Sequence, residues 1–175
     1  SVMNGFRTEL INKIVGFNAH ITVKPYENKI LITNADSSLQ GIAKDLVLSN
    51  SGEAIIVKND TLKGVMLRGY KDKDYSKLKI FNNKNLLENK RILLNDYILI
   101  GKELSFTLNL DIGDRITLMS STGVETIIGN LPKQKTFVVS SIFDSGLADF
   151  DNNIAFINLE TLEEFFDLKD TDRNL

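Results

Sequence analysis

Short segments with the two-residue period of a β-strand alternate irregularly with segments that have the period of an amphipathic helix. Strand patterns are predicted at 18–23, 30–33, 54–58, 65–70, 115–119, 137–143 and 154–157. Their order does not follow the regular strand–helix repeat of a doubly wound parallel sheet. We therefore predict an α+β fold in which mixed sheets are flanked by helices.

Two helices are predicted from apolar residues that recur every three or four positions. The first helix opens the chain, and its apolar stripe is formed by Met3, Phe6, Leu10, Ile14 and Phe17. The second helix ends the fold, and its apolar side is formed by Leu159, Leu162, Phe165 and Phe166. Because the chain starts inside the first helix and lacks an initiator Met, we expect it to be a piece of a longer protein.

The composition is that of a folded globular chain. Hydrophobic residues make up 42% and charged residues 25% of the 175 residues, which argues against disorder. The formal net charge is only −2, so the basic face of a nucleic-acid-binding protein is not expected. The sequence contains no cysteine, which excludes disulfides, thiolate zinc sites and cysteine nucleophiles. No uninterrupted apolar run approaches the roughly 18 residues of a membrane-spanning helix.

The residues of common catalytic sites are missing from the sequence. His20 is the sole histidine, so a transition-metal site would depend on carboxylates, which suit zinc poorly. Neither a Gly-x-Ser-x-Gly elbow nor a Gly-x-x-x-x-Gly-Lys-Ser/Thr phosphate loop is present. We therefore predict a non-catalytic protein that has no cofactor and no metal.

One acidic segment resembles a calcium-binding loop. Asp149, Asp151 and Asn153 occupy the first, third and fifth positions of such a loop, and Glu160 occupies the twelfth. The sixth position requires glycine for a sharp turn, but here it is Ile154, which begins a predicted strand. We interpret the segment as a polar turn before a strand. A calcium-stabilised enzyme or binding protein stays open as an alternative.

The segment 124–139 combines strand-like apolar residues with residues that interrupt a sheet. Its Gly-Asn pair differs from the Asn-Gly or Asp-Gly pair of a tight hairpin, and Pro132 lacks the N–H group that a strand ladder uses. If the segment leaves the sheet, Ile127 and Ile128 become exposed and mark a partner site. From the residues alone, the simpler interpretation is that both isoleucines pack inward and that the neighbouring lysines are ordinary solvated charges.

Several motifs occur in the order found in one known family. They are SVMNGFRTEL, GFNAHITV, GVMLRGY, ILIGKELSFTLNLDIGDRITLMS, GNLPKQKTFVV and IFDSGLADFD. Together they resemble the periplasmic domain of the membrane subunits of lipoprotein-releasing ABC transporters, LolC and LolE. The chain departs from the family at Ser121, which replaces a frequent proline, and at Ala148 and Asp149, which replace an aromatic and acidic pair. The resemblance implies a periplasmic domain of a bacterial inner-membrane protein.

Two lobes, as in MacB-like periplasmic domains, are implied by the resemblance. The first lobe would be formed by the chain ends at 1–70 and 137–175, and 71–136 would form an inserted second lobe. The composition agrees with a boundary at 71–79, where KDKDYSKLK alternates in charge and has few large apolar residues. We predict a solvated link there.

The resemblance also implies partners. Transporters of this family lift lipoproteins from the inner membrane and pass them to the periplasmic chaperone LolA, while a cytoplasmic subunit, LolD, hydrolyses ATP. The implied partners are therefore a LolA-like chaperone, a LolD-like ATPase subunit, a second LolC/LolE-type subunit and the lipoprotein, but no nucleic acid. The opening helix would relay force from the membrane. A related MacB- or FtsX-type protein, with similar lobes but no chaperone-binding hairpin, is the alternative.

The family's projecting hairpin, called the hook, corresponds by position to about 125–135. Pro132 and Gln134 match the family's Pro-x-Gln-Arg stretch, and Lys135 replaces its arginine. With this resemblance, exposure of the isoleucines becomes the favoured interpretation. The predicted partner-binding residues are Ile127, Ile128, Pro132, Lys133, Gln134 and Lys135.

Overall fold

The structure is a computed structural model that describes residues 47–78, 95–169 and 173. The strands predicted at 18–23 and 30–33 and the lone His20 lie outside the described residues. So does the predicted opening helix, with Met3, Phe6, Leu10, Ile14 and Phe17. The force-relay role of that helix therefore stays a prediction.

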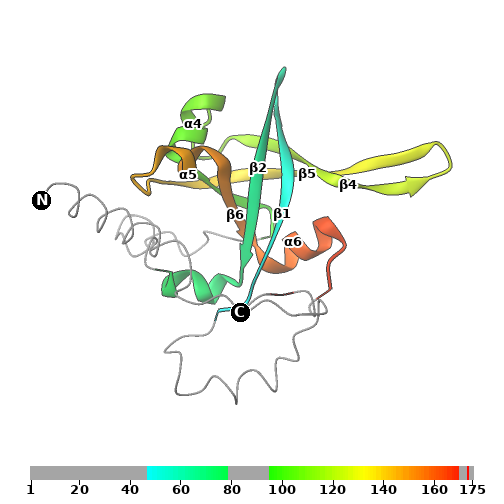
Figure 1. The fold of residues 1–175 in the computed structure, drawn as a ribbon. Helices are drawn as coiled ribbons and strands as arrows, with labels where there is room; N and C mark the ends of the chain where they lie inside the picture. Colours follow the sequence, from blue (N-terminus) through cyan, green and yellow to red (C-terminus); the bar gives the residue numbers. More distant parts are fainter. Residues whose placement is uncertain (1–46, 79–94, 170–172, 174–175) are drawn as a thin grey trace, which may run out of the picture.

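The described residues form six strands that close into one barrel (Figure 1). The strands are β1 (Ser49–Lys58), β2 (Thr61–Tyr70), β3 (Tyr97–Gly101), β4 (Arg115–Thr126), β5 (Gly129–Phe143) and β6 (Ile154–Asn158). Their order around the barrel is β1-β2-β6-β3-β5-β4, and pairing of β1 with β4 closes it. The pairs β2–β6 and β3–β5 are parallel, and the other pairs are antiparallel. The prediction of an α+β fold with a mixed sheet is confirmed.

Four helical segments are described around this barrel. They are the 3-10 helix η1 (Asp72–Lys77) and the α-helices α4 (Lys102–Leu108), α5 (Ala148–Asn153) and α6 (Leu159–Phe166). Figure 1 shows α4 and α6 on opposite sides of the strands. Leu104 and Leu108 of α4 belong to the same buried cluster as Leu162 and Phe165 of α6. The two helices therefore cover the barrel core from two sides.

Alternate residues of each strand fill the inside of the barrel, as the two-residue period of a strand requires. Val65 and Leu67 of β2 are buried there, and so are Phe137 and Val139 of β5. Each such side chain contributes about 1.5–3 kcal/mol when it is fully buried. The strands predicted at 65–70 and 137–143 are confirmed by this pattern.

A second core covers the outer face of β3 and β6. It consists of Tyr70, Tyr75, Leu99, Phe143 and Phe156. The Tyr75 hydroxyl, which comes from η1, donates a hydrogen bond of 2.8 Å to the carbonyl oxygen of Ile157. The prediction of a solvated link at 71–79 is therefore wrong at Asp74 and Tyr75, which are both buried. Charged residues surround Tyr75 in the sequence, so the local composition does not predict its burial. Its burial depends instead on contact with a strand far along the chain.

The helix α6 ends the barrel portion of the chain and confirms the helix predicted there. The side-chain oxygen of its N-cap Asn158 accepts a hydrogen bond of 2.9 Å from the N–H of Glu160. Further along the helix, both carboxylate oxygens of Glu163 bind Arg173, at 2.6 and 2.8 Å. Both of these side chains are buried. This bidentate ion pair holds Arg173 against the helix.

Strands from all three predicted segments lie in the same barrel. β1 and β2 come from 1–70, β3 and β4 come from 71–136, and β6 comes from 137–175. Because 1–46 and 79–94 lie outside the described residues, the division into two lobes stays a prediction.

Close packing of β3 on α5 predicts that Gly101 cannot be enlarged. A Cβ atom added there would lie 2.0 Å from the carbonyl oxygen and 2.5 Å from the Cα of Asp151. These are backbone atoms, which cannot rotate away as a side chain would. We expect Gly101→Ala to lower the free energy of unfolding by about 3 kcal/mol, as measured by denaturant unfolding.

Gly64→Ala is the matched control for this substitution. Gly64 also lies in a strand, but no atom lies within 4 Å of the added Cβ. Its free energy of unfolding should stay within about 0.5 kcal/mol of the unchanged protein. Equal destabilisation by both substitutions would contradict the packing argument.

Candidate partner-binding hairpin

The hairpin of β4 and β5 extends beyond the barrel (Figure 1). β1 pairs with β4 only from Thr117 to Ser120, and β3 pairs with β5 only from Val138 onward. Closer to the tip, β4 and β5 pair with each other and with no other described strand. We call this two-stranded part, residues 121–134, the projecting hairpin.

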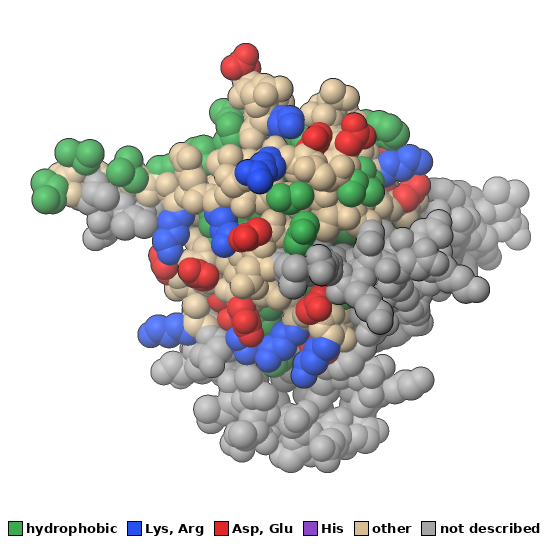
Figure 2. All heavy atoms as spheres, turned by 180° about the vertical axis from the view of Figure 1, so that it is seen from behind, with side chains coloured by type: hydrophobic (Ala, Val, Ile, Leu, Met, Phe, Trp, Pro, Cys, Tyr) green, Lys and Arg blue, Asp and Glu red, His purple; other side chains and the backbone are tan. Residues whose placement is uncertain are grey.

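Two isoleucines form the turn at the tip of the projecting hairpin. Thr126 pairs with Gly129, so Ile127 and Ile128 are the two turn residues. Their exposed fractions are 107% and 88%, and that of nearby Leu131 is 52%. Figure 2 shows hydrophobic side chains gathered at the end of the arm that projects from the body. The tip is therefore an exposed apolar surface.

The strand ladder continues through Pro132, so the predicted interruption of the sheet is wrong. Pro132 is exposed and pairs with Gly123, while Leu131 pairs with Val124. Antiparallel pairs alternate between hydrogen-bonded and non-hydrogen-bonded positions, and the count from the turn puts Pro132 at a non-hydrogen-bonded one. At such a position the backbone nitrogen points away from β4, so a proline removes no ladder bond. The hairpin leaves the barrel as a paired ribbon.

The projecting hairpin begins at a bulge in β4. Between Met119 and Gly123 the pairing shifts, so that four steps along β4 match two steps along β5. The N–H of Lys133 lies opposite the extra residues and donates a hydrogen bond of 3.2 Å to the Ser120 hydroxyl. A bulge bends a strand and increases its twist. This bulge lies where the ribbon departs from the barrel.

Lys133 connects the base of the projecting hairpin to α6. Its Nζ lies 2.5 Å from Asp167 Oδ1 and 3.0 Å from the carbonyl oxygen of Glu164. Asp167 follows the helix directly and has a left-handed backbone with φ of 54°. The ammonium group of Lys133 therefore points toward the body of the domain.

Lys135 also has an acidic neighbour within the chain. Its Nζ lies 3.2 Å from Asp96 Oδ1 and 5.8 Å from the centroid of the Phe137 ring. Lys135 pairs with Leu118, which is still inside the barrel. Between the two lysines, Gln134 is exposed.

The structure divides the predicted binding residues into two groups. Ile127 and Ile128 lie at the tip, whereas Lys133 and Lys135 lie at the base and form ion pairs with the body. Leu131 joins the tip group, although it belongs to the strand-like apolar residues of 124–139 and was not among the predicted binding residues. Its position three residues after the turn was the available signal. Binding by the predicted residues stays a prediction.

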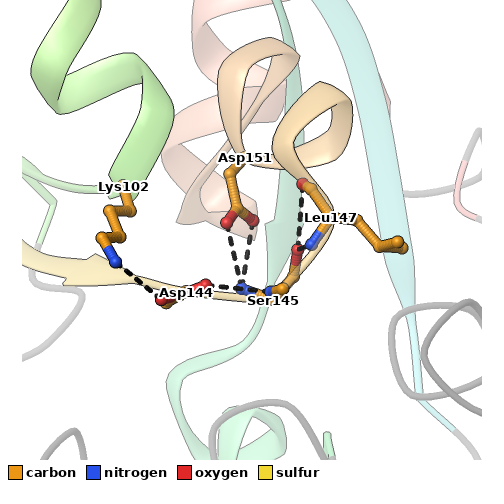
Figure 3. Close-up of polar contacts among 6 residues, drawn as sticks. Lys102, Asp144, Ser145, Leu147 and Asp151 are labelled. Atoms are coloured by element: carbon orange, nitrogen blue, oxygen red, sulfur yellow. Dashed lines mark hydrogen bonds and ion pairs between the residues drawn. The ribbon is translucent and has the colours of Figure 1, made fainter.

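A second polar cluster lies in the loop between β5 and α5 (Figure 3). Both oxygens of Asp151, on α5, accept the N–H of Ser145 at 3.1 Å. Asp144 accepts the N–H of Gly146 at 2.9 Å and binds Lys102 at 3.2 Å. Burial raises the pKa of Asp151, whereas the Gly146 N–H and then Lys102 lower the pKa of Asp144. The cluster fixes the loop that leads into α5.

This cluster does not have the geometry of a calcium loop. Asp149, Asp151 and Asn153 lie on the helix α5, and Glu160 lies in the first turn of α6. Asp151 is buried against a backbone amide, and Asn153 Oδ1 accepts a hydrogen bond of 2.9 Å from Lys63. No metal-ligand group of three acidic, histidine or cysteine residues occurs in the described part of the chain. The segment interpreted as a polar turn is a short helix.

Relatives named LolC match most of the chain. The lipoprotein-releasing system transmembrane protein LolC of Xylella fastidiosa (strain Temecula1) is 26% identical over 173 residues, which cover 94% of the chain. LolC of Neisseria meningitidis serogroup B is 23% identical over 168 residues, which cover 91%. The chain is similar to LolC. It spans 41% and 40% of the length of these two relatives.

The resemblance to LolC seen in the motifs is thus confirmed, and one solved structure supports the fold. The extracellular domain of the noncanonic ABC-type transporter YknZ from Gram-positive bacteria superposes with a TM-score of 0.50 at 14% identity. The match covers 88% of this chain and 81% of that domain. No model of a known protein family matches the chain. None of the helices in the described ranges is long and apolar enough to cross a membrane.

The raised pKa of Asp151 predicts a pH dependence of stability. The folded state binds this proton more tightly than the unfolded chain, whose aspartate pKa is about 3.9. The resulting stabilisation is complete below that value and is lost as pH rises through the raised pKa. Compared with Asp151→Asn, the unchanged protein should therefore lose free energy of unfolding as pH rises above the unfolded aspartate pKa of about 3.9 in denaturant titrations.

Asp144→Asn is the control with the opposite sign. The pKa of Asp144 is lowered, so its stabilisation is present above the unfolded pKa and is lost as pH falls. Compared with Asp144→Asn, the unchanged protein should therefore gain free energy of unfolding as pH rises. Curves of the same sign for the two substitutions would contradict the assigned environments.

Proposed function

We propose that this chain is the periplasmic domain of an inner-membrane ABC transporter subunit that releases lipoproteins and passes them to a LolA-like periplasmic chaperone. The observation that carries the proposal is the tip of the projecting hairpin, where Ile127 and Ile128 are exposed. Similarity to LolC over 94% of the chain supports the transporter context.

The tip has the physical properties of a docking surface. Covering apolar surface recovers about 25 cal/mol per Å², so an exposed isoleucine pair is a strong anchor for a partner. The ribbon that carries the pair is already folded by strand pairing, and Pro132 further restricts its backbone. Less conformational entropy is therefore lost when the partner binds.

The polar residues at the base of the hairpin would contact the partner separately from this anchor. Gln134 is exposed on the same ribbon and would form a polar contact at the rim of the interface. Lys133 and Lys135 would contribute positive potential that steers an acidic partner surface toward the hairpin. Because Lys135 replaces an arginine of the family motif, it would not form a bidentate pair with a carboxylate.

In this proposal the chain transmits force and binds partners without making or breaking covalent bonds. ATP hydrolysis takes place on a separate LolD-like subunit, and a second LolC/LolE-type subunit completes the transporter. The opening stripe of Met3, Phe6, Leu10, Ile14 and Phe17 would relay motion from the membrane into the domain. The lipoprotein would move along the domain toward the hairpin.

Substituting the tip tests the proposal directly. The double variant Ile127→Ser/Ile128→Ser should weaken binding of a purified LolA-like chaperone by roughly 30- to 1,000-fold, because each of the two interface anchors is worth about 1–2 kcal/mol. Binding is measured by surface plasmon resonance or calorimetry. Because both residues are exposed, the thermal unfolding midpoint should stay unchanged.

Leu62→Ser is the matched control for the tip. Leu62 is 67% exposed and lies near the turn of the other long hairpin, formed by β1 and β2. The control should bind the chaperone like the unchanged protein. If the isoleucine variant also binds normally, the chaperone does not use this tip, and a MacB- or FtsX-type function becomes the better proposal.

The polar residues of the hairpin give a separate prediction. Gln134→Ala with Lys135→Ala should weaken chaperone binding without unfolding the domain, because the change removes a rim contact and one steering charge. A pulldown with the chaperone measures the effect, and circular dichroism monitors folding. Undiminished pulldown would count against the assignment of 125–135 as the hook.

A further inference from the structure

The two lysines at the base of the projecting hairpin bind different parts of the body. Lys133 lies at the bulge where the hairpin begins, and it binds Asp167 and the Glu164 carbonyl at the end of α6. Lys135 lies on the barrel side of the bulge and binds Asp96, just before β3. Although the two lysines are only two positions apart, Lys133 therefore contacts the body where the hairpin begins, whereas Lys135 contacts it within the barrel.

The last turn of α6 needs a cation that the helix itself does not supply. It contains no basic residue, while Glu163 and Glu164 lie within it and Asp167 follows it. The C-terminal end of a helix carries partial negative charge, so acidic residues are unfavourable there. Lys133 brings its ammonium group from β5 to within 3.0 Å of the Glu164 carbonyl oxygen. The Lys133 ammonium group therefore offsets the negative charge at the end of α6, and the end of α6 in turn neutralises the positive charge that β5 carries at Lys133.

The helix α6 is firmly attached to the body of the domain. Leu162 and Phe165 are part of the barrel core. Glu163 holds Arg173 through the buried bidentate pair on the same helix. A residue that binds the end of α6 is therefore held in place relative to the barrel.

The projecting hairpin, in contrast, has few attachments. Its strands pair with each other and with no other described strand, and isolated two-stranded ribbons are only marginally stable in orientation and structure. The bulge between Met119 and Gly123 interrupts the ladder where the ribbon leaves the barrel. The contact of Lys133 with α6 lies at this point.

We propose that Lys133 is a positioning residue that fixes the angle between the projecting hairpin and α6, so that the direction of the tip follows this helix. The inference rests on the proposed function only in treating the tip as the binding surface. Because Asp167 is 73% exposed, salt screens the contact, and the hairpin should swing more freely at high ionic strength.

The angle can be measured without any partner. The chain has no cysteine, so Ile128→Cys at the tip and Glu160→Cys at an exposed position of α6 give two defined positions for spin labels. Pulsed electron resonance then reports the distribution of distances between tip and helix. The same labelled pair is measured with Lys133→Ala, with Lys133→Arg and with the matched control Lys135→Ala.

We expect Lys133→Ala to widen the distance distribution by about twofold, and about 1 M NaCl to widen that of the labelled chain with Lys133 intact. Lys133→Arg keeps the cation and should retain a narrow distribution. Lys135→Ala removes the same charge on the barrel side of the bulge and should also leave it narrow. The proposal is overturned if Lys133→Ala leaves the width unchanged, or if Lys135→Ala widens it equally. Thermal unfolding midpoints show that each variant is folded.

Chaperone binding, measured with the native tip, separates this inference from the proposed function. If the hairpin is positioned by Lys133, Lys133→Ala should slow association severalfold more than Lys135→Ala, because both variants lose one steering charge but only Lys133→Ala leaves fewer tips pointing toward the partner. A wider distribution without any change in binding would overturn the functional part of the inference. Failure of the isoleucine variant to affect binding would instead reject the tip itself and leave the measured angle standing.

Discussion

The limited pairing between β1 and β4 determines the shape of the molecule. β1 covers β4 only as far as Ser120, whereas β4 continues to Thr126 and β5 returns from Gly129. The backbone groups beyond Ser120 have each other as partners and no further described strand. The extra length therefore leaves the barrel as a ribbon, and it carries its turn residues out of reach of the core. Every property of the candidate site follows from this excess of strand length.

Because the hairpin is separated from the core, its tip and its base differ in chemistry. The tip contains apolar side chains that take no part in the barrel clusters, so its chemistry can be changed without disturbing core packing. The base is held by charges, with Lys133 against the end of α6 and Lys135 against Asp96. Apolar recognition and electrostatic orientation thus lie at opposite ends of one short ribbon.

The sequence predicted those elements whose burial follows a simple period. The strand at 137–143 and the helix α6 each bury one face, so alternation and helical spacing located them. The effect of Pro132 could not be predicted from the sequence, because it depends on the strand register, which only the paired structure reveals. Tyr75 was missed for a similar reason, since its partner Ile157 lies 82 residues away.

Adjacent residues at the tip show a related limit of sequence analysis. In a strand, Ile127 and Ile128 would face opposite sides, and one of them would be buried, whereas in a two-residue turn both face outward. The period alone could not choose between these outcomes, and the resemblance to LolC-type domains did.

The position of Pro132 has a consequence for how such ribbons meet in solution. An uncovered strand edge offers donors and acceptors to any similar edge, and this is a common route to aggregation. On β5 the outward-facing position at Pro132 has no donor, so a neighbouring molecule cannot build an unbroken ladder along that edge. Self-association through the backbone is thereby discouraged, and the ribbon is left to be recognised by its side chains.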